Sequence, residues 1–560
     1  MPAHVPSSLP SPPHSQPACN ECRGCQSVPR DSPTAAGVEK SQPAGGDAIQ
    51  ETPSRCKLIA LGIALSMALF LVSLDGTILA TAIPRITNEF GSLSDVAWYG
   101  SSYLFAVCAL QLMFGKLYTL YSVKWVFLAA VALFEIGSLI VATSPSSAVF
   151  IVGRTVSGLG AAGIFGGAII IIATYVPLRQ RPIYNGLLSS IHGVASVAGP
   201  LLGGVFTDRT TWRWCFYINL PCGFITVLFL TFIMPSKAPS RPSLSLREQI
   251  KQFDLPGTMF LVPSVVCLLL ALQWGGARYS WTDARIIVLL VAFALFTVIF
   301  CCIQVWQKDQ ATIPVRILTN KNILGGVWFG ACLGAAIFVF SYYLPIWFQA
   351  VKGVSATQSG IMNLPSILGL VIFSIIGGGL ASALGLFTPL LVASAILCSI
   401  ASGLLSTLKV DSSIGYWFGY QVLLAAGVGL GGQNVMLTAQ VAVPEEDMPL
   451  ATSVLAFTQM LSSSIFLAIA QNVFQTQLIK YLTAGVPGVS ADSIIHGGTT
   501  SIRQGVTPEQ LPAVLRAYNH AIIDTFYVAV AVSALSIIGP LSMDRLLLKE
   551  SPKRDSNVKE

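Results

Sequence analysis

Apolar stretches of roughly 20 residues recur along almost the whole of this 560-residue chain, and they leave few folds open. A helix of that length crosses the roughly 30 Å hydrocarbon core of a bilayer. Only 10% of the residues are charged, whereas a soluble domain carries about 25%. The sequence therefore predicts an all-α membrane protein. Its net charge of +7 is spread over loops and tails, which indicates membrane orientation and no nucleic-acid partner.

About fourteen stretches meet this length, and each end is placed to within several residues. We predict helices at 58–83, 97–117, 124–143, 149–175, 186–206, 215–234, 255–273, 285–305, 323–348, 359–382, 386–407, 415–441, 450–474 and 520–543.

A weak internal repeat relates the first six predicted helices to the last six. Residues 153–156 align with residues 419–422, and at the same offset Gly163 meets Gly429. Parallel halves of this kind are a known transporter architecture, with the substrate site at the interface between the halves. We therefore predict two six-helix bundles with two extra helices inserted between them.

The predicted domain organisation follows from these helices. It comprises a disordered cytoplasmic tail (1–56), a first bundle (57–234), a cytoplasmic linker (235–254), two inserted helices with their connecting loop (255–322), a second bundle (323–543) with a long outer loop (475–518), and a cytoplasmic C-terminal tail (544–560). Lysine and arginine in the short loops favour a cytoplasmic location for both termini. Thr507–Gln510 resembles a helix start, which predicts a short amphipathic helix within the outer loop.

Several function classes find no support in the sequence. Cys19, Cys22 and Cys25 in the N-terminal tail lack a nearby fourth ligand, so we expect no metal site there, and their role stays open. Only five histidines are present, too few to favour a histidine-box enzyme, and there is no Gly-x4-Gly-Lys-Ser/Thr loop for ATP. We expect neither enzyme activity nor a cofactor.

Three motifs carry a family resemblance. Leu74–Pro84 (LDGTILATAIP), Ala198–Gly204 (AGPLLGG) and Trp212–Gly223 (WRWCFYINLPCG) resemble motifs of the major facilitator superfamily, specifically its fourteen-span drug:proton antiporters and the fungal toxin and multidrug exporters. The resemblance implies an antiporter, driven by a proton gradient, that exports hydrophobic organic compounds such as toxins, secondary metabolites or drugs. It implies a cell membrane, plasma or vacuolar, and no obligate protein partner.

A second reading keeps the fold and changes the cargo. The chain would then be a proton-coupled or facilitative transporter of one defined solute, such as an iron-chelate or an amino acid. Such a cargo would be expected to come with more fixed charge inside the bundles.

The loop between the second and third helices departs from the family's pattern. Thr119 and Leu120 stand where the family usually has an aspartate and an arginine, and only Gly115, Leu117 and Lys124 remain. Gly115 and Lys124 are the candidates for a gating loop, with Lys124 as the remaining charge.

Ionisable residues inside apolar helices are the candidates for proton coupling, because each costs about 2.5–3.5 kcal/mol to insert. Asp75 is the first candidate for the proton carrier, since low-dielectric surroundings favour a neutral carboxyl group. Arg154 matches the family's fourth-span arginine and needs a carboxylate or carbonyl partner. Glu135 is a weaker candidate for a second proton site. The alternatives are a helix cap for Asp75 and a static ion pair for Arg154.

Two further groups complete the candidate site. Gly199, Pro200, Gly203 and Gly204 favour close helix approach and a kink, which suits either a hinge or simple packing. Aromatic and amide residues of the ninth and thirteenth helices suit the lining of an apolar cavity, although aromatic residues also form interfacial belts. These candidate substrate contacts are Phe348, Gln349, Tyr342, Phe457 and Gln459.

Overall fold

The computed structural model describes residues 55–92, 95–234, 253–276, 279–485 and 507–544, and these fold into helices joined by short connections. Within these ranges, fourteen helices are long and apolar enough to cross a membrane, which confirms the predicted fold class. The predictions for most of the two tails, for most of the linker and for the centre of the outer loop fall outside the described residues, as do Cys19, Cys22 and Cys25.

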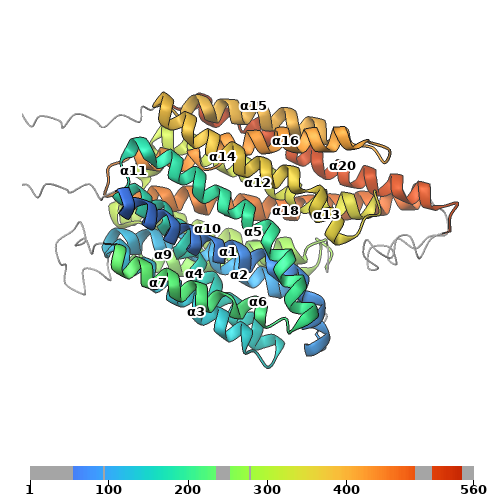
Figure 1. The fold of residues 1–560 in the computed structure, drawn as a ribbon, viewed down its shortest axis with the longest axis horizontal. Coiled ribbons are helices and arrows are strands. Elements are labelled where there is room, and N and C mark those ends of the chain that lie inside the picture. The colour runs from blue at the N-terminus through green and yellow to red at the C-terminus, as the bar shows by residue number, and fades with distance from the viewer. Residues whose placement is uncertain (1–54, 93–94, 235–252, 277–278, 486–506, 545–560) are drawn as a thin grey trace, which may run out of the picture. The chain divides into compact units, whose positions relative to one another are not determined.

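The first half packs two layers of helices (Figure 1). Its elements are α1 (Arg55–Phe90), α2 (Val96–Leu120), α3 (Val123–Ala142), α4 (Ser147–Tyr175), α5 (Arg181–Arg209), α6 (Trp214–Tyr217) and α7 (Asn219–Ile233). Helix α4 packs against α2 and α3, whereas α1 packs against α5 and α7. Helices α1 and α5 hold two of the motifs singled out in the sequence, Leu74–Pro84 and Ala198–Gly204, and the third, Trp212–Gly223, runs through α6 into α7.

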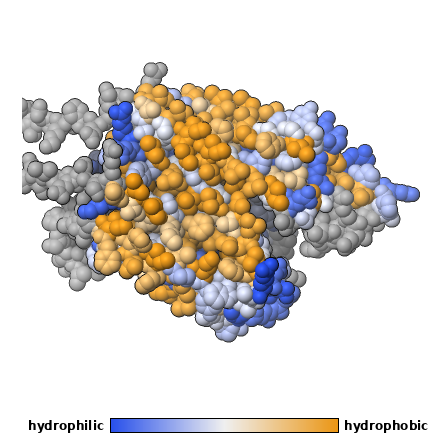
Figure 2. Space-filling model, viewed as in Figure 1, coloured by the Kyte–Doolittle hydropathy of each residue, from blue (hydrophilic) through white to orange (hydrophobic). Residues whose placement is uncertain are grey.

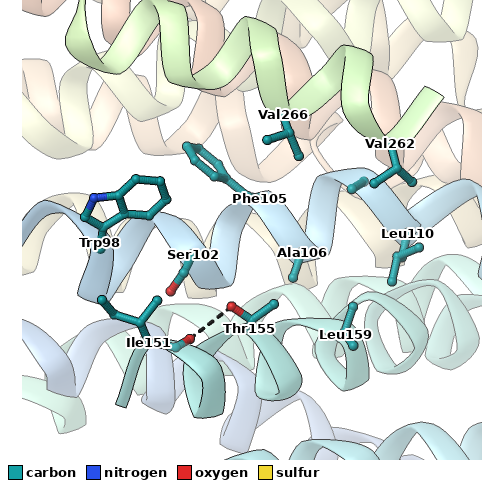
Figure 3. A pocket seen from close by; sticks show the side chains of 11 residues that line it. Trp98, Ser102, Phe105, Ala106, Leu110, Ile151, Thr155, Leu159, Val262 and Val266 are labelled. Carbon is teal, nitrogen blue, oxygen red and sulfur yellow. Dashed lines mark hydrogen bonds between the residues drawn. The ribbon is translucent and has the colours of Figure 1, made fainter. Parts of the chain in front are cut away.

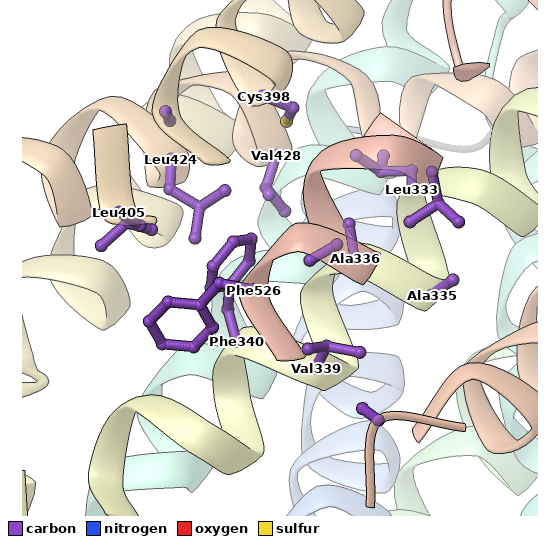
Figure 4. Close-up of a cluster of buried hydrophobic side chains, with 14 of the residues drawn as sticks. Leu333, Ala335, Ala336, Val339, Phe340, Cys398, Leu405, Leu424, Val428 and Phe526 are labelled. Carbon is purple, nitrogen blue, oxygen red and sulfur yellow. The ribbon is translucent and has the colours of Figure 1, made fainter. Parts of the chain in front are cut away.

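The second half is built around a large apolar core. Its elements are α12 (Lys321–Ala350), α13 (Ala356–Met362), α14 (Leu364–Leu384), α15 (Thr388–Leu405), α16 (Ile414–Gly431), α17 (Leu437–Val441), α18 (Met448–Gly485), α20 (Leu511–Leu535) and α21 (Ile538–Ser542). In the core, Phe340 of α12 and Phe526 of α20 stack with ring centroids 5.0 Å apart (Figure 4). Leu405 and Val428 join them from α15 and α16.

The two inserted helices form a hairpin beside both halves. Helix α9 (Leu255–Trp274) packs on α10 (Ala284–Gln307) and also contacts α2 and α18. Helix α10 is strongly apolar, yet only Ile286, Phe300 and Gln304 of its 24 residues are buried in the protein. Such an apolar and exposed helix is expected to face lipid. Figure 2 shows the same pattern over the whole visible face, with a broad apolar belt between polar ends.

The start of the last long helix corrects one prediction. Residues 507–510 form a turn that leads directly into α20, so the separate amphipathic helix predicted there was wrong. Val514, Ala517 and Tyr518 of this segment are buried in the second core. The apolar side chains therefore extend the final membrane helix by nine residues beyond its predicted start at residue 520.

The two halves touch mainly through two helix pairs, α2 with α18 and α5 with α14, and α4 also contacts α18. Gly115 near the end of α2 lies against Ser453 near the start of α18, and Gly186 near the start of α5 lies against Ser374. Ser190 of α5 also donates a hydrogen bond to the carbonyl of Val371, with an O···O distance of 3.3 Å. Small side chains thus allow close backbone approach between the halves.

Candidate functional site

A buried ion pair joins α1 to α4. The guanidinium Nη1 of Arg154 donates a hydrogen bond to Oδ2 of Asp75, and the exposed fractions of the two side chains are 1% and 0%. Nε of Arg154 also donates to the backbone carbonyl of Tyr99 at 3.0 Å. The structure thus brings together the two ionisable residues that the sequence marked first.

Aromatic rings enclose this pair. The ring of Tyr103 in α2 lies 4.5 Å from the guanidinium carbon of Arg154, and the ring of Phe216 lies at 5.9 Å. Oδ1 of Asp75 and the hydroxyl of Tyr103 are buried and have no hydrogen-bond partner among the described residues. The site therefore pairs the charges at one carboxylate oxygen and leaves the other oxygen without a partner among the described residues.

The glycine motif of α5 holds α1 close to the pair. A Cβ atom at Gly199 would collide with Thr77, and one at Gly203 would collide with Thr81. The hydroxyl of Thr77 also donates to the carbonyl of Ala195 at 3.1 Å. Close packing at these two glycines thus fixes the α1 segment that begins two residues after Asp75.

The other two residues of the motif, Pro200 and Gly204, are less closely packed. Pro200 is exposed, and Gly204 has no neighbour within 4 Å of an added Cβ atom. Gly199 and Gly203 are therefore the packing residues of the motif.

Glu135 is buried apart from the Asp75–Arg154 ion pair. Its carboxylate lies against Gly223 of α7, and both oxygens lack a hydrogen-bond partner in the described ranges. Nearby, Asn219 of α7 donates a hydrogen bond to Ser138 of α3 at 3.1 Å. Glu135 thus sits at the α3–α7 contact, and Arg154 makes no hydrogen bond to it.

The two gating-loop candidates contact different helices. Gly115 faces α18 of the second half, whereas Nζ of Lys124 donates to the carbonyls of Thr231 and Met234, both at 2.7 Å. Lys124 is buried at the end of α7 and satisfies carbonyls that the helix itself leaves unpaired. These bonds place Lys124 within the first half.

The predicted substrate contacts are spread over several environments. Phe348 is fully buried in the second core, where its ring packs 5.1 Å from that of Trp417. Gln349 donates to the carbonyl of Pro345 at 3.3 Å, and Tyr342 is exposed.

Phe457 and Gln459 belong to α18. Phe457 is buried in a cluster shared by α2, α9 and α18, and Gln459 lies against Gly334 of α12. The structure does not gather the five candidates into one cavity lining.

A cavity of about 290 Å³ lies instead between α2, α4 and α9 (Figure 3). Trp98 and Phe105 of α2, Leu159 of α4 and Val266 of α9 make its lining mainly apolar. Ser102 supplies a buried hydroxyl with no hydrogen-bond partner in the described part of the chain. The cavity therefore suits an apolar molecule, and it adjoins α4, which carries Arg154, and α2, which carries Tyr103.

Comparison with known proteins decides the family. The family model described as Major Facilitator Superfamily matches residues 65–467. The chain belongs to the major facilitator superfamily. The resemblance noted in the motifs is thereby confirmed.

Several relatives in this superfamily are similar along nearly their whole length. "Efflux pump roqT" of Penicillium rubens is 48% identical, over 93% of this chain and 95% of the relative. "MFS-type transporter astH" of Aspergillus oryzae is 46% identical, over 95% and 93%. "MFS-type efflux pump MFS1" of Arthroderma benhamiae is 45% identical, over 92% and 97%.

Solved structures of the superfamily share the fold. The proton:xylose symporter XylE matches with a TM-score of 0.55 and 13% identity, over 86% of this chain and 95% of that one. The human organic anion transporter MFSD10 matches with a TM-score of 0.53 and 13% identity, over 85% and 99%. At this identity the likeness concerns the fold alone.

Two tyrosines beside the ion pair were not predicted from the sequence. Tyr99 and Tyr103 are four residues apart on α2, so both lie on the face that meets Arg154. That spacing is visible in the sequence, but an interfacial aromatic belt has the same composition. Within the described ranges, no group of three or more His, Cys, Asp and Glu side chains is placed to hold a metal ion.

Proposed function

We propose that this superfamily member is a proton-driven antiporter that exports hydrophobic organic compounds. Its relatives at 48% and 45% identity bear the printed names of efflux pumps. We place it in a cell membrane, plasma or vacuolar, with both termini in the cytoplasm and with the proton gradient in place of a cofactor.

The observation that carries the proposal is the buried pair of Asp75 and Arg154. Protonation of Asp75 removes its negative charge and leaves the Arg154 guanidinium as an uncompensated charge in a buried site. Removing one partner of a buried ion pair costs about 3–5 kcal/mol. Protonation of Asp75 would therefore change the free-energy difference between two arrangements of α1 and α4 by enough to shift the equilibrium between them.

A contact route leads from the pair to the second half. Asp75 is on α1, α1 packs on α5 through Gly199 and Gly203, and α5 packs on α14. A displacement of α1 would therefore change the α5–α14 contact between the halves. Coupling then requires only that protons and cargo differ in affinity between the two states.

The contacts between the halves support an outward-facing state. On α2 and α18 they lie near the helix ends that face the cytoplasm in the predicted topology. Between α5 and α14 they run from Pro182 and Gly378, near those same ends, to Gly193 and Val371, near the middle of both helices. In this state the cytoplasmic side is closed, so a proton from outside would reach Asp75 before inward opening.

The cavity between α2, α4 and α9 favours an apolar cargo over a charged solute. Apolar side chains with one unpaired hydroxyl recognise a hydrophobic molecule that has a single hydrogen-bonding group. This lining supports an organic exporter over the alternative of an iron-chelate or amino-acid transporter.

Efflux from proteoliposomes tests the proposal. Apolar fluorescent compounds would be loaded and a proton gradient imposed across vesicles that contain wild type, Asp75→Asn or Asp524→Asn. Asp524 is the matched control, because it is also a carboxylate in a membrane helix but accepts a hydrogen bond from Tyr481 at 2.9 Å.

We expect gradient-driven efflux in wild type and in Asp524→Asn, and gradient-independent exchange alone in Asp75→Asn. The double variant Asp75→Asn/Arg154→Gln removes both charges and should behave in the same way if the single variant folds poorly. Efflux that ignores the gradient in wild type would refute antiport.

A further inference from the structure

The loop between α10 and α12 is bound to both halves of the protein. This bridging loop (residues 308–320) contains the short helices η3 (Lys308–Gln310) and α11 (Val315–Leu318). It follows the inserted hairpin and leads into the second half. Its hydrogen bonds show which helix ends it fastens.

The first fastening is to α2. Nζ of Lys116 donates a hydrogen bond to the backbone carbonyl of Gln310 at 2.9 Å, and the Lys116 side chain is buried. Lys116 follows Gly115, the residue of α2 that meets α18. The bridging loop is thus bound at the point where the first half touches the second.

The second fastening is to the start of α18. Nη2 of Arg316 lies 2.7 Å from Oδ1 of Asp447, and Nδ2 of Asn320 donates to the carbonyl of Ala442 at 2.9 Å. Asp447 directly precedes α18, and Ser453 of α18 packs on Gly115. Both fastenings therefore lie beside the same contact between the halves.

A buried carboxylate holds the bridging loop in shape. Oδ2 of Asp254 accepts hydrogen bonds from Nε2 of Gln304 at 2.6 Å and from the backbone N and hydroxyl of Thr312 at 2.8 and 2.7 Å. Its Oδ1 accepts from the backbone N of Gly257 at 2.8 Å, which caps the start of α9. These four bonds thus join the inserted hairpin and the bridging loop into one hydrogen-bonded unit.

We propose that the bridging loop is a fastener that holds the cytoplasmic ends of α2 and α18 together in the outward-facing state. It takes the place of the aspartate and arginine that the family usually has where this chain carries Thr119 and Leu120. Asp254 is its positioning residue. This inference rests on the proposed function, because it presumes that the halves separate on the cytoplasmic side.

The strengths of the bonds indicate which fastening opens. Asp254 is fully buried and accepts four hydrogen bonds, and the Lys116 side chain that binds the loop to α2 is buried as well. The Arg316 side chain is instead 46% exposed. Buried charge-assisted networks are much stronger than exposed ion pairs. The Arg316–Asp447 pair is therefore the one that breaks when α2 and α18 separate, and the loop stays with the hairpin and α2.

Hydrogen–deuterium exchange of the full chain in nanodiscs, without cargo or gradient, tests the fastener. The variants are Arg316→Gln, Asp447→Asn and their double variant, and the peptides cover residues 112–120 and 447–456. Lys321→Gln is the matched control, because it breaks a 2.6 Å ion pair with Asp544 that joins two parts of the second half only.

We expect each single variant to speed exchange in both peptides by about two- to five-fold, as the loss of one partly exposed pair allows. The double variant should add nothing further, and Lys321→Gln should leave both peptides unchanged. Asp254→Asn should speed exchange in 308–313 and in 112–120 by about ten-fold or more, because it disrupts a buried network.

Two results would overturn the fastener. One is faster exchange confined to residues 308–320, and the other is an equal effect of Lys321→Gln. Since no transport is measured, loss of the fastener would leave the antiport proposal standing, and a failed efflux assay would leave the exchange result intact.

Discussion

The ring of Tyr103 covers the guanidinium of Arg154 at 4.5 Å, while its own buried hydroxyl has no hydrogen-bond partner among the described residues. The ring and the hydroxyl of one side chain thus have separate effects on the ion pair. The ring stabilises the cation, and the hydroxyl is buried without compensation.

Tyr103→Phe should therefore fold at least as stably as wild type. Removing an unpaired buried hydroxyl relieves a penalty of about 1–3 kcal/mol and keeps the ring over Arg154. Tyr103→Leu should instead lower the free energy of unfolding by about 1–2 kcal/mol, because the cation–π contact is lost. Thermal unfolding in detergent compares the two, and a strong loss of stability in Tyr103→Phe would show that the hydroxyl is bonded.

Gly199→Ala should destabilise the α1–α5 contact. The added methyl group meets Thr77 and the backbone of Ile78, and overpacking of this kind costs about 1–3 kcal/mol. We also expect slower gradient-driven efflux, since α1 carries Asp75. Gly204→Ala is the control, because its Cβ atom meets nothing within 4 Å. Equal melting temperatures for the two variants would contradict this packing role.

Lys124→Met should weaken the end of α7. The substitution leaves the carbonyls of Thr231 and Met234 without the ammonium donor, and hydrogen bonds to a charged group contribute about 1.5–3 kcal/mol each. We expect faster amide exchange in residues 226–234 and a lower melting temperature. If Lys124 acted only as a gate, exchange there would stay as in wild type and efflux alone would change.

An ion pair at the end of α1, beyond the membrane-spanning segment Cys56–Leu79, gives a pH dependence. Burial alone would raise the pKa of Glu89, but hydrogen bonds from Trp212 and Arg213, at 2.6 and 2.8 Å, and the charge of Arg213 hold the pKa below its usual value. A lowered pKa means that the pair stabilises the fold above the ordinary Glu pKa of about 4.3. That contribution is lost as pH falls through the lowered pKa.

The measurement is the melting temperature of wild type and Glu89→Gln between pH 3 and pH 7. Wild type should be more stable above about pH 5, and the two should converge as pH falls through the lowered pKa of Glu89. The difference will be small, because Glu89 is 43% exposed. A gap that widens toward acid pH would reverse the sign and exclude this role for the pair.

Much of this fold and part of its site could be predicted from the sequence. Asp75 and Arg154 stand out because charged residues are rare in apolar helices, and the need of Arg154 for a partner follows from the same physics. Their pairing could not be predicted, since 79 residues separate them and the packing of α1 beside α4 decides it.

Phe348 shows what could not be predicted, because it was expected to contact substrate and is a core residue instead. An apolar helix such as α12 is hydrophobic all round, so its sequence does not tell a core-facing ring from a cavity-facing one. The structure buries Phe348 between Trp347 and Trp417. Asp254 was missed for a similar reason, because an aspartate before a helix is usually read as a simple cap.

The exposed apolar surface of α10 makes this part of the structure sensitive to the thickness of the bilayer. Its 24 residues span about 36 Å at 1.5 Å per residue, which exceeds a hydrocarbon core of about 30 Å. A helix of this length can match the bilayer by tilting, and the tilt would then change with membrane thickness. Helix α9 packs on α10 and also contacts both α2 and α18. A change in the tilt of α10 would therefore act on the contact between the two halves. Sterol content would then tune the transporter without binding to it.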